Sequence, residues 1–308
     1  MKIIYLGTPD FAVLPLQKLV ENGFNVVAVV SQPDRPVGRK KEIKPTPVKQ
    51  YALSQGIPVY QFEKISKEYS PLLSLNADIM VTCAYGQILN SEVINLTPKG
   101  VFNIHASLLP KYRGASPIQS VILNGEEYTG VTIMKTDIGV DTGDIVSVEK
   151  VKILPTETAG ELFDRLAVVG ADLIVKTLRD IEQGKESYTK QDSCCATHCK
   201  MIKKSDAFLN FDEPANVVFN KIRGYNPSPI AYCKFNGKFL KIFRAELSDC
   251  SGNSGEVLFA DRQNGLVIAC QDKAIKLLLV QEEGGKQMSV NDYLLGRKIK
   301  VGDQAEKC

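Results

Sequence analysis

The first two thirds of the chain alternates short apolar runs with segments of helical periodicity, and this alternation restricts the fold more than any other feature. Residues 3–6 form an apolar run closed by Gly7, and residues 26–30 are apolar throughout. A strand without a polar face is typical of a parallel sheet covered on both sides. Further strands are predicted at 57–60, 78–83 and 100–104. We therefore expect right-handed crossovers and an α/β fold with a Rossmann-like, mostly parallel sheet.

The pattern changes after a long helix that is predicted to follow Pro155. Thr158 and Glu161 have the spacing of a capping box, and Gly184 suits the position after the last helical turn. Several short strand-like runs then follow, separated by turns such as Asn236-Gly237, and predict a small all-β, OB-like barrel. The expected organisation is an N-terminal α/β domain over residues 1–189, a linker over 190–206 and a C-terminal β-barrel domain over 207–308.

Composition limits the cellular setting and the kind of partner. The 308 residues include 38 Lys and Arg against 35 Asp and Glu, a net charge of +3 that argues against a protein coating nucleic acid nonspecifically. The N-terminus lacks a basic region followed by a long apolar stretch, and no run approaches the length of a membrane helix. We expect a cytoplasmic protein without a membrane partner, a monomer, whose eight Cys are reduced thiols.

The chain has only two histidines, and one of them is a candidate for acid–base chemistry. Asn103 and His105 are two residues apart at the end of a predicted strand, so their side chains share one face. Ligands of open α/β sheets bind beyond such strand ends. An amide donor beside an imidazole suits stabilisation of a developing oxyanion. The alternative is a structural His beside a turn-forming Asn, and spacing alone does not separate the two.

An Asp- and Gly-rich segment carries Asp137, Asp141 and Asp144. Such segments are usually turns with local hydrogen bonds. A metal site with His105 as an added ligand is a second interpretation, although the spacing is not that of an EF-hand. In a third, one carboxylate orients His105 and stabilises its charged form.

Two further segments suggest sites only weakly. The turn that begins at Gly7 lacks the glycine spacing of a nicotinamide-cofactor site, and Pro9 removes one backbone donor. The cluster of Cys194, Cys195, His198 and Cys199 is too crowded for the usual zinc spacing. We expect no metal, and reduced thiols in a linker.

A basic stretch follows the second predicted strand. Residues 35–49 hold six basic side chains and one acidic one, Glu42. Gly38 and three Pro predict an irregular loop. Such a run is ordinarily a solvated loop, but a cationic loop beside a site could order against phosphates. The candidate contacts are Arg35, Arg39, Lys40, Lys41 and Lys44.

Together these segments resemble the folate-dependent formyltransferases over almost the whole chain. The resemblance is carried by residues 6–12, 84–89, 103–110, 112–114, 141–144, 222–223 and 226–227. Residues 31–39 and the C-terminal domain are similar to the tRNA-directed members of the family. The sequence departs from the usual pattern at Asn90, at Ser228 and in residues 206–211.

The resemblance implies transfer of the formyl group of 10-formyltetrahydrofolate to the α-amino group of initiator methionyl-tRNA. Asn103 and His105 would stabilise the tetrahedral oxyanion, and Asp141 would hold His105 charged and help move the proton. Arg39 matches an arginine that contacts tRNA. The folate would meet two segments, made of Ser107, Leu108, Leu109 and Pro110, and of Tyr85, Gly86, Gln87, Ile88 and Leu89.

Three rival functions stay open on the sequence. A formyltransferase for a small amine, such as a sugar nucleotide, would need neither the basic stretch nor the second domain. A non-catalytic RNA-binding protein would not need the set formed by Asn103, His105 and Asp141. A hydrolase that releases formate would use water in place of the amine.

Overall fold

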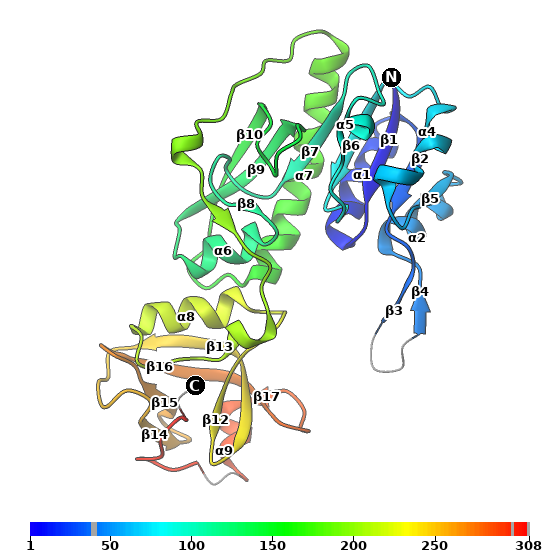
Figure 1. Cartoon of the computed structure of the whole chain (residues 1–308). Coiled ribbons are helices and arrows are strands. Elements are labelled where there is room, and N and C mark those ends of the chain that lie inside the picture. The colour runs from blue at the N-terminus through cyan, green and yellow to red at the C-terminus, as the bar shows by residue number, and fades with distance from the viewer. Residues whose placement is uncertain (38–41, 297–298, 307–308) are drawn as a thin grey trace. The chain divides into compact units, whose positions relative to one another are not determined.

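In a computed structural model of the chain, residues 1–37, 42–296 and 299–306 are described (Figure 1). By their internal contacts they form two units. Unit 1 comprises residues 1–117, 128–152 and 163–199, and unit 2 comprises residues 118–127, 153–162 and 200–308. Each unit therefore contains segments that are far apart in the sequence, whereas the predicted division at residues 189 and 206 is linear.

Unit 1 is built on a seven-stranded sheet in the order β10-β9-β7-β6-β1-β2-β5. The pairs from β5 across to β7 are parallel, whereas β9 and β10 pair antiparallel. The predicted mostly parallel sheet is thereby confirmed. The strands are Lys2–Gly7 (β1), Asn25–Ser31 (β2), Val59–Gln61 (β5), Ile79–Cys83 (β6), Val101–His105 (β7), Tyr128–Lys135 (β9) and Ile145–Lys152 (β10).

The order of these strands creates a place for a ligand. The chain runs outward from β1 through β2 to β5 and then returns to the other side of β1 as β6. Ligands of open α/β sheets bind where the strand order reverses, beyond the carboxyl ends. Residues 3–6 of β1 have no exposed surface, as an apolar central strand requires.

Helices border this sheet in the alternating pattern that the sequence predicts (Figure 1). Thr158 and Glu161 form the predicted capping box at the start of α7, since each side chain accepts a hydrogen bond from the other's backbone N–H. Gly184 follows α7 with a φ of +65°, as a C′ glycine does. Asn90 caps the short helix α5 by accepting from the Val93 N–H. The helices are Val13–Glu21 (α1), Pro47–Ser54 (α2), Ile65–Glu68 (α3), Ser70–Leu73 (α4), Ser91–Ile94 (α5) and Ala159–Glu182 (α7).

The basic stretch was expected to be an irregular loop, and this expectation is wrong for its described ends. Arg35–Val37 (β3) and Glu42–Lys44 (β4) form an antiparallel pair in which Arg35 lies opposite Lys44. Pro36 fits because a two-stranded ribbon has free edges, where a missing backbone donor costs little. The candidate residues Arg39, Lys40 and Lys41 lie outside the described residues.

Unit 2 is dominated by an antiparallel sheet in the order β12-β13-β16-β15-β14, to which β17 adds beside β16. The C-terminal segment links its two edges, because the Ala305 N–H donates to Gly255 and the Glu306 N–H to Lys234. This antiparallel sheet confirms the predicted C-terminal β domain, although the unit also contains the helices α6, α8 and α9. The elements are Pro117–Leu123 (α6), Ala215–Gly224 (α8), Ala231–Phe235 (β12), Lys238–Ser248 (β13), Val257–Asp261 (β14), Gly265–Ala269 (β15), Ala274–Glu282 (β16), Met288–Ser289 (β17) and Val290–Leu294 (α9).

No helix among the described residues is long and apolar enough to cross a membrane. The longest, α7, contains 24 residues, and charged side chains interrupt it throughout.

Candidate active site

Asn103, His105 and Asp141 come together in unit 1. Asn103 and His105 lie on β7, two residues apart, at its carboxyl end. Asp141 lies in the loop between β9 and β10. Its Oδ1 accepts a hydrogen bond from Asn103 Nδ2 at 3.4 Å, and its Oδ2 lies 3.6 Å from His105 Nδ1. The side chains of His105 and Asp141 are 7% and 16% exposed. The cluster is therefore screened from bulk water.

The amide of Asn103 has a defined orientation. A carboxylate only accepts hydrogen bonds, so the amide nitrogen must be the atom that faces Asp141. The Thr82 hydroxyl donates to Asn103 Oδ1 at 2.8 Å and holds the other side of the amide. One N–H of Asn103 then remains to donate elsewhere. Thr82 lies on the neighbouring strand β6, where it pairs with Asn103 in register.

Both ring nitrogens of His105 face acceptors. Nε2 lies 2.9 Å from the backbone oxygen of Tyr112, and this oxygen can only accept, so Nε2 carries a proton. Nδ1 faces Asp141 at 3.6 Å, which is too long for a strong hydrogen bond but suits attraction between opposite charges. The arrangement can therefore stabilise positive charge on the ring.

The loop that carries Asp141 needs outside support, because Asp141 has a φ of +53°, in the left-handed region. The Gly114 N–H donates to Asp141 Oδ2 at 2.8 Å. Gly114 belongs to the short strand Arg113–Gly114 (β8), which pairs with His198–Cys199 (β11). Asp137, in the same loop, accepts from the Gly139 N–H and the Thr142 hydroxyl and caps the turn locally.

The first predicted folate segment follows β7 directly. The Ser107 hydroxyl donates to the Lys111 oxygen at 2.7 Å, and Thr132 on β9 bridges the Ser107 oxygen and the Leu109 N–H. Ser107 is fully buried and Leu109 nearly so, whereas Leu108 and Pro110 are half-buried. The segment is therefore a rigid wall beside the Asn103–His105 pair.

The second predicted folate segment follows β6, at the reversal of the strand order. Its backbone is tied to the ends of β1 and β2, because the Tyr85 oxygen accepts from Thr8 and Gln32. The Gln87 amide accepts from the Ile65 N–H and donates to the Phe62 oxygen, so it holds the segment in place. Ile88 is exposed, Leu89 lies in the core, and Gly86 has a φ of +91°.

The Tyr85 hydroxyl has no hydrogen-bond partner among the described residues, although it is buried. Burial raises the pKa of Tyr85 well above its usual range, so the hydroxyl stays neutral and keeps its proton. A buried hydroxyl without a partner is costly unless a ligand supplies one. This makes the segment suitable for a polar ligand atom.

The described part of the basic stretch is partly neutralised. Arg35 pairs with Glu63 at 2.5 Å, and Lys49 pairs with Asp34 at 2.6 Å. Lys44 is 62% exposed, and its nearest acid, Glu42, lies 3.9 Å away. Two acids outside residues 35–49, Asp34 beside the window and Glu63 farther along the chain, therefore offset part of its charge.

The metal interpretations gain no support. Among residues 1–37, 42–296 and 299–306, no group of three or more His, Cys, Asp or Glu could hold an ion. Cys194 and Cys195 are exposed, whereas Cys199 is buried and directs its Sγ toward the backbone oxygens of Tyr112 and Arg113.

Comparisons with known proteins identify the family. Residues 1–178 match the family "Formyl transferase", and residues 201–298 match "Formyl transferase, C-terminal domain". The methionyl-tRNA formyltransferase of Agathobacter rectalis is 43% identical over 307 residues, covering 98% of both chains. That of Lachnospira eligens is 44% identical over 313 residues, again covering 98% of both. The chain belongs to the methionyl-tRNA formyltransferase family.

The fold of the chain is also similar to that of a solved structure. An N-formyltransferase from Helicobacter canadensis, in complex with folinic acid and dTDP-3-aminofucose, superposes with a TM-score of 0.68 at 23% identity. The match covers 90% of this chain and 99% of that one. As a member of the methionyl-tRNA formyltransferase family, the chain is an enzyme, a formyl group transferase.

Sequence reasoning missed several residues of this formyltransferase site. Thr82 and Thr132 are polar residues within apolar strands, and this exception to the apolar pattern was the available signal. Tyr112 and Arg113 were part of the resemblance but received no role. Gln191 had no signal at all, because it lies in a polar stretch that reads as a linker.

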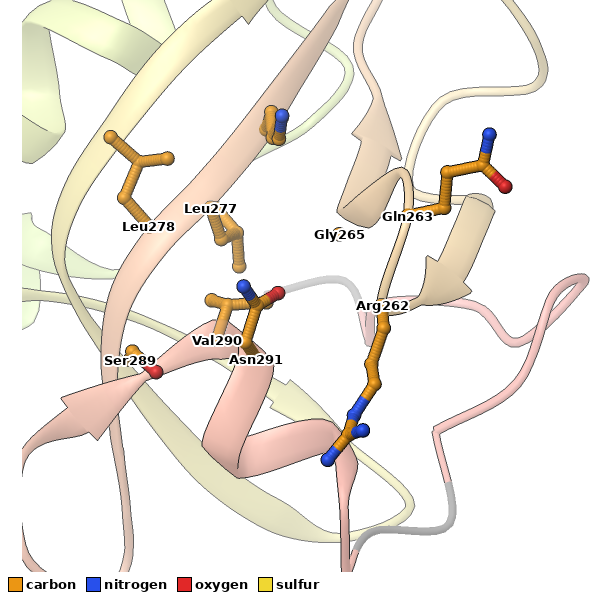
Figure 2. Close-up of a pocket in the computed structure, with 9 residues that line it drawn as sticks. Arg262, Gln263, Gly265, Leu277, Leu278, Ser289, Val290 and Asn291 are labelled. Atoms are coloured by element: carbon orange, nitrogen blue, oxygen red, sulfur yellow. The ribbon is translucent and has the colours of Figure 1, made fainter.

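Unit 2 of this formyltransferase has a hollow of its own, of about 490 Å³ including its open mouth (Figure 2). Arg262 and Gln263 border it from the turn between β14 and β15, and Asn291 borders it from α9. Lys276 also lines the hollow but is paired with Glu246 at 3.4 Å. None of the predicted catalytic or folate residues lies there.

Proposed function

We propose that this enzyme transfers the formyl group of 10-formyltetrahydrofolate to the α-amino group of initiator methionyl-tRNA, giving the N-formylated initiator for translation. The observation that carries the proposal is the cluster of Asn103, His105 and Asp141 at the end of β7. The nearly full-length likeness to methionyl-tRNA formyltransferases supports this choice of acceptor. The reaction would take place in the cytoplasm, and the protein would act as a monomer.

In the proposed reaction the neutral amine attacks the formyl carbon, a new C–N bond forms, and the carbonyl oxygen becomes an oxyanion. Asn103 donates its remaining N–H to this oxygen, while Thr82 and Asp141 keep the amide turned that way. His105, held by the Tyr112 oxygen at Nε2 and facing Asp141 at Nδ1, places a ring that can carry positive charge beside this oxygen. Donors that are already oriented lower the barrier because they need no rearrangement as charge develops.

Proton movement completes the exchange. The amine must lose one proton, and the N10 atom of the folate must gain one when its bond to the formyl carbon breaks. Asp141 stabilises a proton on His105 Nδ1 during this transfer, at the 3.6 Å separation of the two side chains. The reaction needs no covalent enzyme intermediate, since the amine is itself the nucleophile.

The two folate segments are suited to the donor in different ways. Residues 107–110 form a rigid wall that would position the formyl group beside Asn103 and His105. Ile88 offers exposed apolar surface to a flat ring, and the buried Tyr85 hydroxyl lacks a partner among the described residues. These features fit a pterin, which has a flat ring and polar edges.

The basic stretch, residues 35–49, would contact phosphates of the acceptor stem. Lys44 and Arg35 are both exposed, and Arg35 would have to exchange Glu63 for a phosphate. Arg39, Lys40 and Lys41 are proposed contacts on the sequence resemblance alone. Contacts of this kind make binding depend on salt.

One assay tests the proposal. The protein is incubated with 10-formyltetrahydrofolate and charged initiator tRNA, and formylmethionine is measured after deacylation. We expect formylation of methionyl-tRNA, and the same tRNA carrying no amino acid serves as the control. Turnover of a small amine instead, or formate release without any acceptor, would overturn the proposal and indicate the corresponding rival activity.

A further inference from the structure

We propose that Gln191 and Arg113 form a positioning pair that holds Asp141 against His105 and Asn103. This inference rests on the proposed function, because it assigns Asp141 a role in formyl transfer. Neither Gln191 nor Arg113 touches the three side chains directly. Both act through the backbone segments that hold them.

Gln191 fastens the loop of Asp141 from outside. Its Nε2 donates to the Asp141 oxygen at 2.9 Å and to the Gly143 oxygen at 2.7 Å. Both hydrogens of one amide group are thus used on one loop. The loop needs this support because Asp141 has a left-handed backbone, which is unfavourable for a residue other than glycine.

Arg113 fixes the other end of the same side chain. Its Nε and Nη2 donate to Gln191 Oε1 at 3.0 and 2.7 Å. A guanidinium only donates, so the atom facing it must be the amide oxygen, and the amide nitrogen is necessarily turned toward the loop. Arg113 is only 4% exposed, so its side chain is held by its surroundings.

The pair joins the two backbones that orient the catalytic groups. Tyr112, before Arg113, supplies the oxygen that meets His105 Nε2, and Gly114, after it, supplies the N–H that meets Asp141 Oδ2. Gln191 ties this segment to the Asp141 loop. The segment 112–114, Gln191 and the Asp141 loop therefore close a ring of hydrogen bonds, and His105 is attached to this ring through the Tyr112 oxygen.

The segment that carries Gln191 is itself anchored. Thr189 exchanges two backbone hydrogen bonds with Ile145, each of 2.8 Å. Further along, Thr197 accepts from the Tyr112 N–H through its hydroxyl and from the Arg113 N–H through its oxygen. Residues 190–199, which the sequence predicted to be part of a linker, thus form a strap across the site together with Thr189.

The test is a double-mutant cycle with Gln191→Ala and Asp141→Asn. Because a displacement of about 1 Å can cost two orders of magnitude, we expect Gln191→Ala to lower kcat by about 10- to 100-fold. We expect both KM values to stay within about threefold, since the pair contacts neither substrate. In the Asp141→Asn background, the further loss from Gln191→Ala should be under about threefold.

Two variants make the result specific. Gln191→Glu keeps the acceptor for Arg113 but loses both donors, so it should lose kcat at least as severely, and it serves if the alanine variant folds poorly. Gln183→Ala is the matched control, because Gln183 is exposed and its side chain makes no hydrogen bond among the described residues. Its kcat should match that of the wild type.

Additive losses in the two backgrounds would mean that Gln191 supports the fold in general, and an unchanged kcat would mean that it supports nothing in the site. Either result overturns the positioning pair. A separate measurement does not depend on activity: hydrogen exchange at the Gly114 amide, followed by NMR, should accelerate in Gln191→Ala and not in Gln183→Ala. If the wild type fails to formylate methionyl-tRNA, the proposed function fails, and this exchange rate still decides whether Gln191 holds Asp141.

Discussion

Replacing Asp141 by Asn tests the centre of the proposed mechanism, because it changes charge and hydrogen bonding while keeping shape. Both carboxylate oxygens accept: Oδ2 from the Gly114 N–H at 2.8 Å, and Oδ1 from Asn103 Nδ2 at 3.4 Å. An amide has one oxygen and one NH2 group. In either orientation, the NH2 group introduced by Asp141→Asn would face another N–H donor, that of Gly114 or that of Asn103. Facing Asn103 costs less because that contact is longer.

The expected size of the effect follows from the distance to His105. Two unit charges 3.6 Å apart attract by about 4 to 5 kcal/mol at an effective dielectric of about 20. Asp141 is 16% exposed and the charge on the ring is partial, so we take about 3 kcal/mol as the part lost at the transition state. Since about 1.4 kcal/mol is a factor of ten in rate, kcat should fall by about 10²- to 10³-fold.

The assay is the rate of formylmethionine formation at saturating concentrations of both substrates, with tRNA affinity measured separately by filter binding. Asp137→Asn removes the same charge from the same loop but touches only Gly139 and Thr142, so its kcat should stay within about threefold of the wild type. A folded Asp141→Asn enzyme with near-normal kcat would refute the reasoning. Equal losses in both variants would refute it as well, because the effect would then belong to the loop.

Three further predictions follow from single contacts. Thr82→Val removes the donor to Asn103 Oδ1, so kcat should fall by about tenfold, and Thr82→Ser should restore it in the same assay. Burial alone would raise the pKa of Asp34, but hydrogen bonds from Lys49 and Gln61 outweigh it and lower the pKa. The stabilisation of the folded state by the charged carboxylate is therefore present above the ordinary pKa of 3.8 and is lost as the pH falls below it. Urea unfolding should therefore show Lys49→Met to be less stable than the wild type by about 1 kcal/mol at pH 7, and this difference should shrink as the pH falls below 3.8. A difference that does not shrink in acid would contradict the ion pair. Burial raises the pKa of Cys83 and of Cys233 to about 12, so iodoacetamide at pH 8 should label exposed Cys194 and leave both buried thiols unlabelled until the protein unfolds, as mass spectrometry would show.

Much of the fold was predictable because it depends on local patterns. The apolar run of residues 26–30 indicated a parallel strand without reference to its partners, and Thr158 with Glu161 indicated where α7 begins. The pair Asn236-Gly237 has φ values of +50° and +76°, as the predicted hairpin turn requires. Each of these signals lies within a few residues, so the sequence contains it directly.

The division into units was less accessible. Residues 118–127 and 153–162 share unit 2 with residues from 200 onward, although long segments of unit 1 separate them in the sequence. Gly224 shows how such packing arises, since an added Cβ would lie 2.9 Å from a methyl group of Leu123. This contact joins residues about a hundred positions apart, and no local pattern reports it.

The same reasoning explains why the site was half predictable. Asn103 and His105 share a strand, so period-2 geometry alone brings their side chains to one face. Asp141 required the pairing of β9 with β10, and Gln191 required a strap whose hydrogen bonds run to residues some fifty positions away or more. Residues that bear reactive groups are identified by their chemistry, whereas residues that orient them through backbone oxygens can be of any polar type. Gln191 is therefore the kind of residue that only a structure reveals. A variant that loses its two N–H donors should show the effect of positioning on kcat while Asn103, His105 and Asp141 are all still present.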